Sequence, residues 1–160
     1  MVSSRVEEFL IIHFNLYWGS MSIQILNKRL TPDKTMLCEG LSIKEFRCKC
    51  LHPSCCLVII TDNLRLAYEI SRRTFQLPLK INSGHRCAWY NHYLREKGKA
   101  KTATLSRHVT GEAIDISKHH IEHLDKEYVR QTFRDSGFST VIEYENFWHC
   151  DVRKELLRAF

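Results

Sequence analysis

Three segments of the chain carry apolar residues at the spacing of an amphipathic helix. The first begins after residues 61–63, whose Thr, Asp and Asn side chains are good helix caps, and ends before Pro78. Its apolar positions include Leu64, Ala67 and Phe75. The same criteria predict two further helices, each followed by glycine, over residues 89–97 and 125–136.

Short alternating segments between these helices predict strands. Residues 22–30 suggest an extended segment, residues 79–82 a short strand, and residues 140–152 a hairpin that turns near residues 145–146. In the alternating segment 111–117, Asp115 shares one face with Ala113. Because strands and helices are mixed without regular βαβ alternation, the expected fold class is α+β.

The first 21 residues read as an N-terminal extension. Their apolar stretch, residues 9–18, is too short to span a bilayer, and Glu7 and Glu8 stand where a secretory signal carries positive charge. We expect the extension to be helical or loosely packed, without stable membrane insertion. Residues 22–160 are expected to form one domain.

Composition narrows the class of protein. The 160 residues are 44% hydrophobic and 26% charged, which is ordinary for a globular domain and excludes a disordered or fibrous chain. The 24 Lys and Arg against 18 Asp and Glu give a net charge of +6, which favours an anionic partner without selecting one. Since the sequence has no Arg- and Lys-crowded helix and no basic motif interleaved with aromatic residues, no nucleic acid is expected as a partner.

Seven cysteines cannot all pair within one chain. Four of them crowd into nine residues: Cys48, Cys50, Cys55 and Cys56. They could bind a structural zinc ion through thiolates, but their spacing departs from the usual paired C-x₂-C, and buried reduced thiols are the other interpretation. Cys87 and Cys150 are expected to pack as small apolar groups.

Three side chains in the last third of the chain could bind a catalytic metal ion. They are His108, Asp115 and His149. A catalytic zinc uses three protein ligands and keeps one position open for water. His149 stands two residues before Asp151 in the last predicted strand, so both side chains leave on the same face. With nine histidines in the chain, spacing alone does not separate a ligand from an ordinary polar residue.

A ten-residue motif changes this picture. Residues 106–115 read SRHVTGEAID and resemble the S-x-H-x-x-G-x-A-x-D signature of the zinc D-Ala-D-Ala carboxypeptidase family. Residues 81–86, INSGHR, resemble the family's I-N-S-G-Y-R block, and residues 147–153, FWHCDVR, resemble its closing strand. Residues 45–50, EFRCKC, resemble the E-F-x-C-K-C segment of phage-type members. Ordered blocks of this kind make the resemblance specific.

The resemblance covers residues 41–153 and implies both a fold and a reaction. Family members cleave peptidoglycan peptides, and their fold, a small antiparallel sheet with flanking helices, is shared by hedgehog signalling domains. By resemblance, Arg86 binds a substrate carboxylate and Ser106 hydrogen-bonds the substrate. The implied zinc ligands are His108, Asp115 and His149.

The family mechanism also needs a general base to take a proton from water. Many members place an acid three residues before the last histidine, but here that position is Asn146. Phage-type members resemble this chain in having a glutamate six residues before it, Glu143. A three-residue hairpin loop would aim Glu143 at the face of His149, and a two-residue loop would aim it at the opposite face. We therefore expect Glu143 as the base, with Glu145 second and Asp151 third.

The resulting hypothesis is a zinc metallopeptidase of bacterial peptidoglycan. It would act as a D-Ala-D-Ala carboxypeptidase or as a cell-wall endopeptidase, and small size without a clear secretion signal suits a phage endolysin. The expected cofactor is Zn²⁺, the partner is a peptidoglycan peptide, and the chain is expected to be a monomer. The alternative from another class is a catalytically inactive, zinc-bearing binding module of the same fold.

Overall fold

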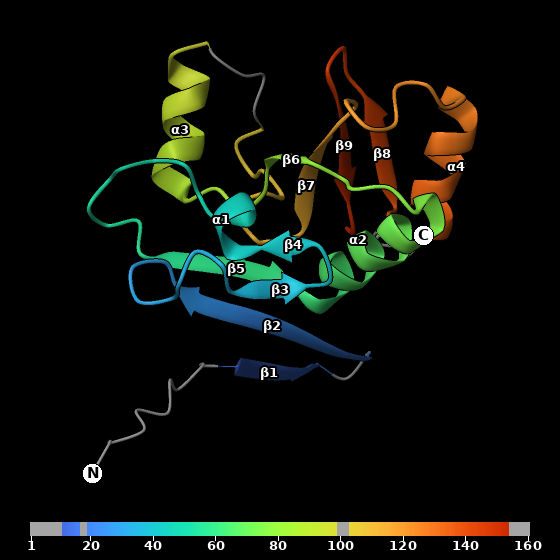
Figure 1. Ribbon diagram of the computed structural model, residues 1–160. Coiled ribbons are helices and arrows are strands. Elements are labelled where there is room, and N and C mark those ends of the chain that lie inside the picture. The colour runs from blue at the N-terminus through green and yellow to red at the C-terminus, as the bar shows by residue number, and fades with distance from the viewer. Residues whose placement is uncertain (1–10, 17–18, 99–102, 154–160) are drawn as a thin grey trace, which may run out of the picture.

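Two antiparallel sheets and a short hairpin are packed with four helices in the part of the chain that the computed structural model describes, residues 11–16, 19–98 and 103–153 (Figure 1). The elements are β1 Ile11–Leu16, β2 Gly19–Asn27, β3 Met36–Cys38, β4 Leu41–Ser42, α1 Ile43–Phe46, β5 Leu57–Thr61, α2 Asp62–Phe75, β6 Ile81–Ser83, α3 Ala88–Glu96, β7 Ala113–Ser117, α4 Lys126–Asp135, β8 Thr140–Glu143 and β9 Phe147–Asp151. The α+β class with a small antiparallel sheet and flanking helices is confirmed.

The C-terminal sheet has four strands in the order β6-β7-β9-β8, all antiparallel. In Figure 1 this sheet lies between α3 on one side and α4 on the other, with α2 and the N-terminal strands below it. One face of β7 and β9 packs into the core through Ile114, Ile116, Trp148 and Cys150, all of which are buried. The opposite face is thereby left for polar side chains.

The predicted helices form close to their expected bounds. The Thr61 hydroxyl accepts a hydrogen bond from the Leu64 amide and caps α2, while Asp125 caps α4 in the same way through the Tyr128 amide. Leu64, Ala67 and Phe75 of α2 are buried, and the Tyr68 hydroxyl lies 2.9 Å from the carbonyl oxygens of Gly40 and Leu79. None of the helices in the described residues is long and apolar enough to cross a membrane.

The N-terminal strands differ from expectation. Residues 11–16, expected to be helical or loosely packed, form the strand β1, and β1 pairs antiparallel with β2. The expected boundary at residue 21 falls inside β2, and the first ten residues of the extension lie outside the described part. Sequence reasoning also missed β5, whose run of β-branched residues between turns was the available signal.

Gly111 joins the two sheets at a backbone contact. Its φ is +72°, and a methyl group added to it would lie 2.3 Å from the Ile59 carbonyl oxygen in β5. The Thr61 amide donates to the Gly111 carbonyl at 3.1 Å. Because only glycine allows both the positive φ and this approach, β5 fixes the segment that leads into β7.

We expect Gly111→Ala to lower the free energy of unfolding by at least about 2 kcal/mol, because it adds both backbone strain and a steric clash. Gly98→Ala is the matched control, since Gly98 also has a positive φ of +61° but no atom of the described residues within 4 Å of an added methyl. Urea unfolding of both variants measures the difference. Equal losses in the two would contradict a role for the contact with Ile59.

Candidate metal centre

The pairing of β7 with β9 places Asp115 directly opposite His149. Residues opposite each other in an antiparallel pair project from the same face. The distance from Asp115 Oδ1 to His149 Nδ1 is 2.8 Å. The same register puts Asp151 opposite Ala113, one step along this face. The expectation that His149 and Asp151 leave on one face is therefore confirmed.

His108 reaches the same point from the turn before β7. It is 2% exposed, and its Nε2 lies 3.2 Å from Asp115 Oδ1. One potential ligand atom from each of His108, Asp115 and His149 lies within 4.8 Å of the other two. The structure thus brings together all three side chains that the sequence singled out as ligands.

Each histidine has its second ring nitrogen bound to an oxygen acceptor. His108 Nδ1 lies 2.7 Å from the Gly84 carbonyl oxygen, and His149 Nε2 lies 3.3 Å from Asp151 Oδ2. With a metal ion in place, a hydrogen on each of these nitrogens would donate outward, and the nitrogen that faces Asp115 would be free to bind the ion. This arrangement of imidazole and outer acceptor is the one that orients histidine ligands at metal sites.

The charges of the three side chains also suit a cation. Burial lowers the pKa of His108 and so disfavours its charged form. Burial opposes ionisation of Asp115, but hydrogen bonds from His108 and His149 outweigh it and hold the Asp115 pKa well below its usual range. Burial likewise opposes a charge on His149, yet the two aspartates raise its pKa to about 9. The aspartates therefore favour positive charge here, either a proton or a metal ion, and the residues fit zinc.

Arg86 holds the second oxygen of Asp115. Its Nη2 donates to Asp115 Oδ2 at 2.7 Å and its Nε donates to Ser83 Oγ at 2.9 Å, with the guanidinium side chain 12% exposed. This ion pair orients Asp115 so that Oδ1 faces the histidines. The resemblance suggested substrate binding for Arg86, and its contact with Asp115 was not foreseen. Ser106 is partly buried in the turn before His108, and its substrate role stays a prediction.

The β8–β9 hairpin corrects the predicted position of Glu143. The Tyr144 amide donates to the Phe147 carbonyl at 2.9 Å, so the loop has two residues, 145 and 146, and not three. Glu143 stands opposite Trp148, while Ile142 stands opposite His149. Because neighbouring residues on a strand point to opposite faces, Glu143 faces away from His149, and the register argument for it as the base is wrong.

Glu143 instead binds basic side chains beside α4. Its Oε1 lies 2.6 Å from Lys118 Nζ and 2.8 Å from Lys126 Nζ, and Arg130 is 3.7 Å from Oε2. Hydrogen bonds from Lys118 and Lys126 lower the Glu143 pKa to about 2. Its position indicates a structural role that ties the end of β8 to β7 and α4.

Two supporting groups of the centre escaped sequence reasoning. The Gly84 carbonyl leaves no side-chain signature, since any residue carries such an oxygen. Asp151 was placed on the correct face but considered only as a proton acceptor. Its spacing to His149 was the signal for an orienting carboxylate.

A family model described as Peptidase M15 matches residues 39–151. The matched region includes the four-stranded sheet, the turn with His108 and the strands with Asp115 and His149. No curated protein and no solved structure matches the chain significantly.

We expect Glu143→Gln to destabilise the protein at neutral pH, because it removes the charge that binds Lys118 and Lys126. The lowered pKa means that this stabilisation is present above about pH 4.5 and is lost as the pH falls toward 2. The difference in urea midpoint between variant and wild type should therefore shrink over that range. Glu145→Gln, in the exposed turn, should change the midpoint little at any pH. A constant difference down to pH 2 would contradict the ion-pair assignment.

Proposed function

The chain belongs to the peptidase M15 family, and we propose that it is a zinc metallopeptidase that hydrolyses peptide bonds of bacterial peptidoglycan. The observation that carries the proposal is the convergence of His108, Asp115 and His149 with both imidazoles oriented by outer oxygen acceptors. Three ligands of the types found in catalytic zinc sites leave a fourth position for water. The family match supports a peptidase, and the substrate and bond are our inference from the motifs.

Zinc at this centre would supply an acidified water and a Lewis acid for the scissile carbonyl. The chain's own residues supply the orientation. The Gly84 carbonyl and Asp151 fix the rings of His108 and His149, and Arg86 fixes the carboxylate of Asp115. Misplacement of any ligand would cost both metal affinity and the geometry of attack.

Arg86 and Ser106 are proposed to bind the substrate. A guanidinium has five N–H donors, and Ser83 and Asp115 account for two of those on Arg86. Donors therefore remain for a substrate carboxylate such as that of a terminal D-Ala. Ser106 lies two residues before His108, so a hydrogen bond from its hydroxyl would fall beside the same ligand.

The proton acceptor is proposed to be Glu145. Glu143, the first candidate, lies on the far face of the hairpin, so Glu145 is the next candidate for the base. Glu145 is exposed in the turn that leads into the strand of His149. Asp151 is less suited, because hydrogen bonds from Arg153 and His149 hold its pKa well below its usual range despite its burial. A carboxylate of that kind orients an imidazole more readily than it accepts a proton from water.

The proposal predicts both a zinc ion and a reaction product. The purified protein should release terminal D-Ala, or expose a new amino group inside the peptide, when it is incubated with peptidoglycan fragments. His108→Ala should lower the zinc content by one equivalent and abolish the reaction. Metal analysis and mass spectrometry of the digested fragments measure the two. A wild-type protein that binds zinc here but cleaves no fragment would support the inactive binding module instead.

The register of the hairpin predicts which glutamate matters for turnover. Glu145→Gln should lower kcat by about 10²–10⁴-fold while zinc stays bound, because the amide cannot accept the proton. Glu143→Gln is the matched control, two residues away on the same hairpin, and should retain kcat at a temperature where it is folded. Single-turnover assays on a synthetic muropeptide measure both variants. If Glu143→Gln is the inactive one, the two-residue register is not that of the active enzyme.

A further inference from the structure

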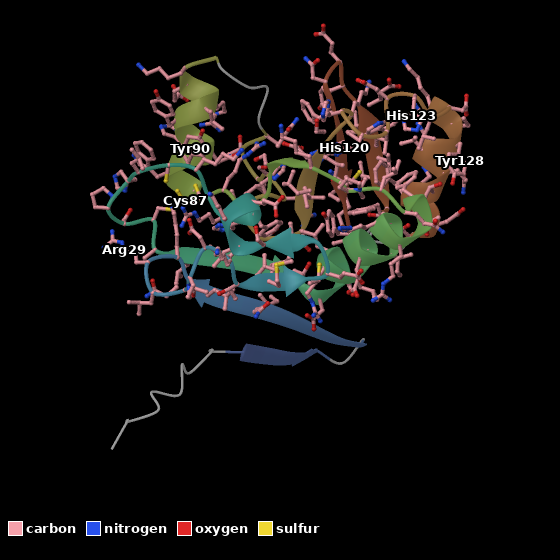
Figure 2. The ribbon with its side chains drawn as sticks, in the orientation of Figure 1. Arg29, Cys87, Tyr90, His120, His123 and Tyr128 are labelled. Carbon is pink, nitrogen blue, oxygen red and sulfur yellow. The ribbon has the colours of Figure 1, made fainter. Side chains whose placement is uncertain are left out.

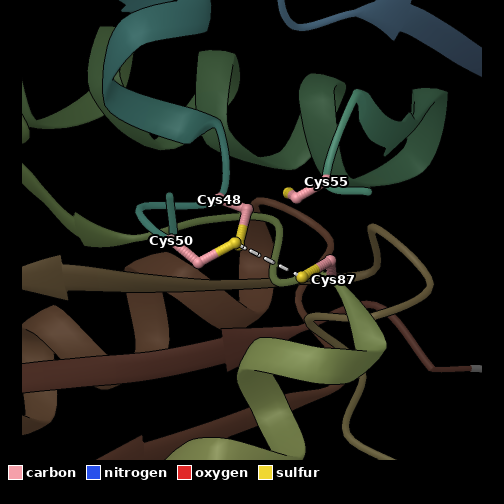
Figure 3. Close-up of side chains that lie close together, drawn as sticks. All are labelled: Cys48, Cys50, Cys55 and Cys87. Atoms are coloured by element: carbon pink, nitrogen blue, oxygen red, sulfur yellow. Dashed lines mark hydrogen bonds between the residues drawn. The ribbon is translucent and has the colours of Figure 1, made fainter. Parts of the chain in front are cut away.

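Four cysteine side chains from three segments of the chain converge beside the first turn of α3 (Figure 3). They are Cys48, Cys50, Cys55 and Cys87. Their sulfur atoms all lie within 4.8 Å of one another. The grouping expected from the sequence is corrected here, because Cys87 takes the place assigned to Cys56.

The distances among the sulfur atoms of Cys48, Cys50 and Cys87 match those of a tetrahedral metal site. Cys50 Sγ lies 3.5 Å from the sulfur atoms of both Cys48 and Cys87, and Cys48 lies 3.8 Å from Cys87. A zinc–sulfur bond of about 2.3 Å in a tetrahedron separates neighbouring sulfurs by about 3.8 Å. A disulfide requires a separation of about 2.05 Å, so all four thiols here are unpaired.

Hydrogen-bond donors surround the sulfur atoms. Lys28 Nζ lies 3.7 Å from Cys55 Sγ and donates to the Cys50 carbonyl at 2.9 Å. The Tyr90 amide donates to Cys87 Sγ at 3.4 Å, which makes Cys87 the N-cap of α3 (Figure 2). Burial raises the pKa of the Cys87 thiol to about 11 and that of the Cys55 thiol well above its usual range, so the thiolate form that binds metal needs a nearby positive charge. The cationic amine and the helix N-terminus assist this ionisation, and a bound metal ion would complete it.

Burial separates this cluster from a catalytic site. Cys48, Cys50 and Cys55 are 1%, 6% and 5% exposed, and Cys87 is partly buried. Four protein ligands in a closed site leave no position for water or substrate. A set of thiolates at these separations selects a single thiophilic ion.

We propose that Cys48, Cys50, Cys55 and Cys87 bind one structural Zn²⁺ ion. This site is separate from the centre of His108, Asp115 and His149, and it does not depend on the protein being a peptidase. The ion joins the segment after α1 and the segment before β5 to the start of α3. Cys87 also follows Arg86, whose backbone amide donates to the His108 carbonyl at 3.0 Å.

The test is the metal content of the purified full chain. The wild type should hold two equivalents of zinc and no iron. Cys87→Ser should hold one, while Cys56→Ser, which removes the neighbouring cysteine outside the cluster, should still hold two. The proposal would be overturned if the two cysteine variants had equal zinc content or if the wild type held iron in place of zinc. It would also be overturned by a wild-type mass lower by two hydrogens, which would indicate a disulfide.

His108→Ala tests the cysteine site without changing a cysteine. This variant should keep one zinc, and on replacement with cobalt it should show the near-ultraviolet thiolate-to-cobalt absorption. Absence of zinc and of that absorption from folded His108→Ala would overturn the cysteine site even if Cys87→Ser fails to fold. If the cysteines bind zinc in a protein that has no hydrolytic activity, the cysteine site is supported and only the proposed peptidase function is contradicted.

Discussion

The pairing of Asp115 with His149 across β7 and β9 is the constraint on which the candidate centre depends. One face of these strands is buried in the core through Ile114, Ile116 and Trp148, and the other face carries the polar ligands. A slip of one residue would turn Asp115 and His149 into the core and the apolar residues toward the candidate centre. Burial of the apolar face therefore specifies the register, and the register places two of the three ligands.

The third ligand depends on contacts outside this strand pair. His108 belongs to a turn, and a turn is held by its neighbours and not by a ladder of hydrogen bonds. The Gly84 carbonyl fixes its ring, and Gly111 fixes the end of the turn against β5. The N-terminal sheet thus positions a ligand although it contributes none.

Features that depend on residues close together in the sequence were predicted well. The three long helices follow from cap residues and apolar spacing, and the ligand triad follows from one ten-residue motif and a closing strand. The position of Glu143 could not be predicted in this way. A hairpin loop of three residues instead of two shifts the register by one residue, which turns the Glu143 side chain to the opposite face of the sheet. The sequence of Val141, Ile142 and Glu143 does not by itself distinguish the two loop lengths. The packing of Val141 into the core decides which register forms.

The cysteine cluster shows the same limit over a longer range. Cys55 and Cys56 are adjacent, so composition cannot tell which of them turns inward, and Cys87 comes from a helix cap that only the fold brings near Cys50. The position of Cys87 next to Arg86 also links the cysteine cluster to the candidate metal centre. An open metal site has three protein ligands and cannot gain rigidity from a fourth, so its ligands must be held by neighbouring structure. Arg86 orients Asp115 and is covalently joined to Cys87, so a closed thiolate site at Cys87 would fix the backbone from which Arg86 reaches the open one.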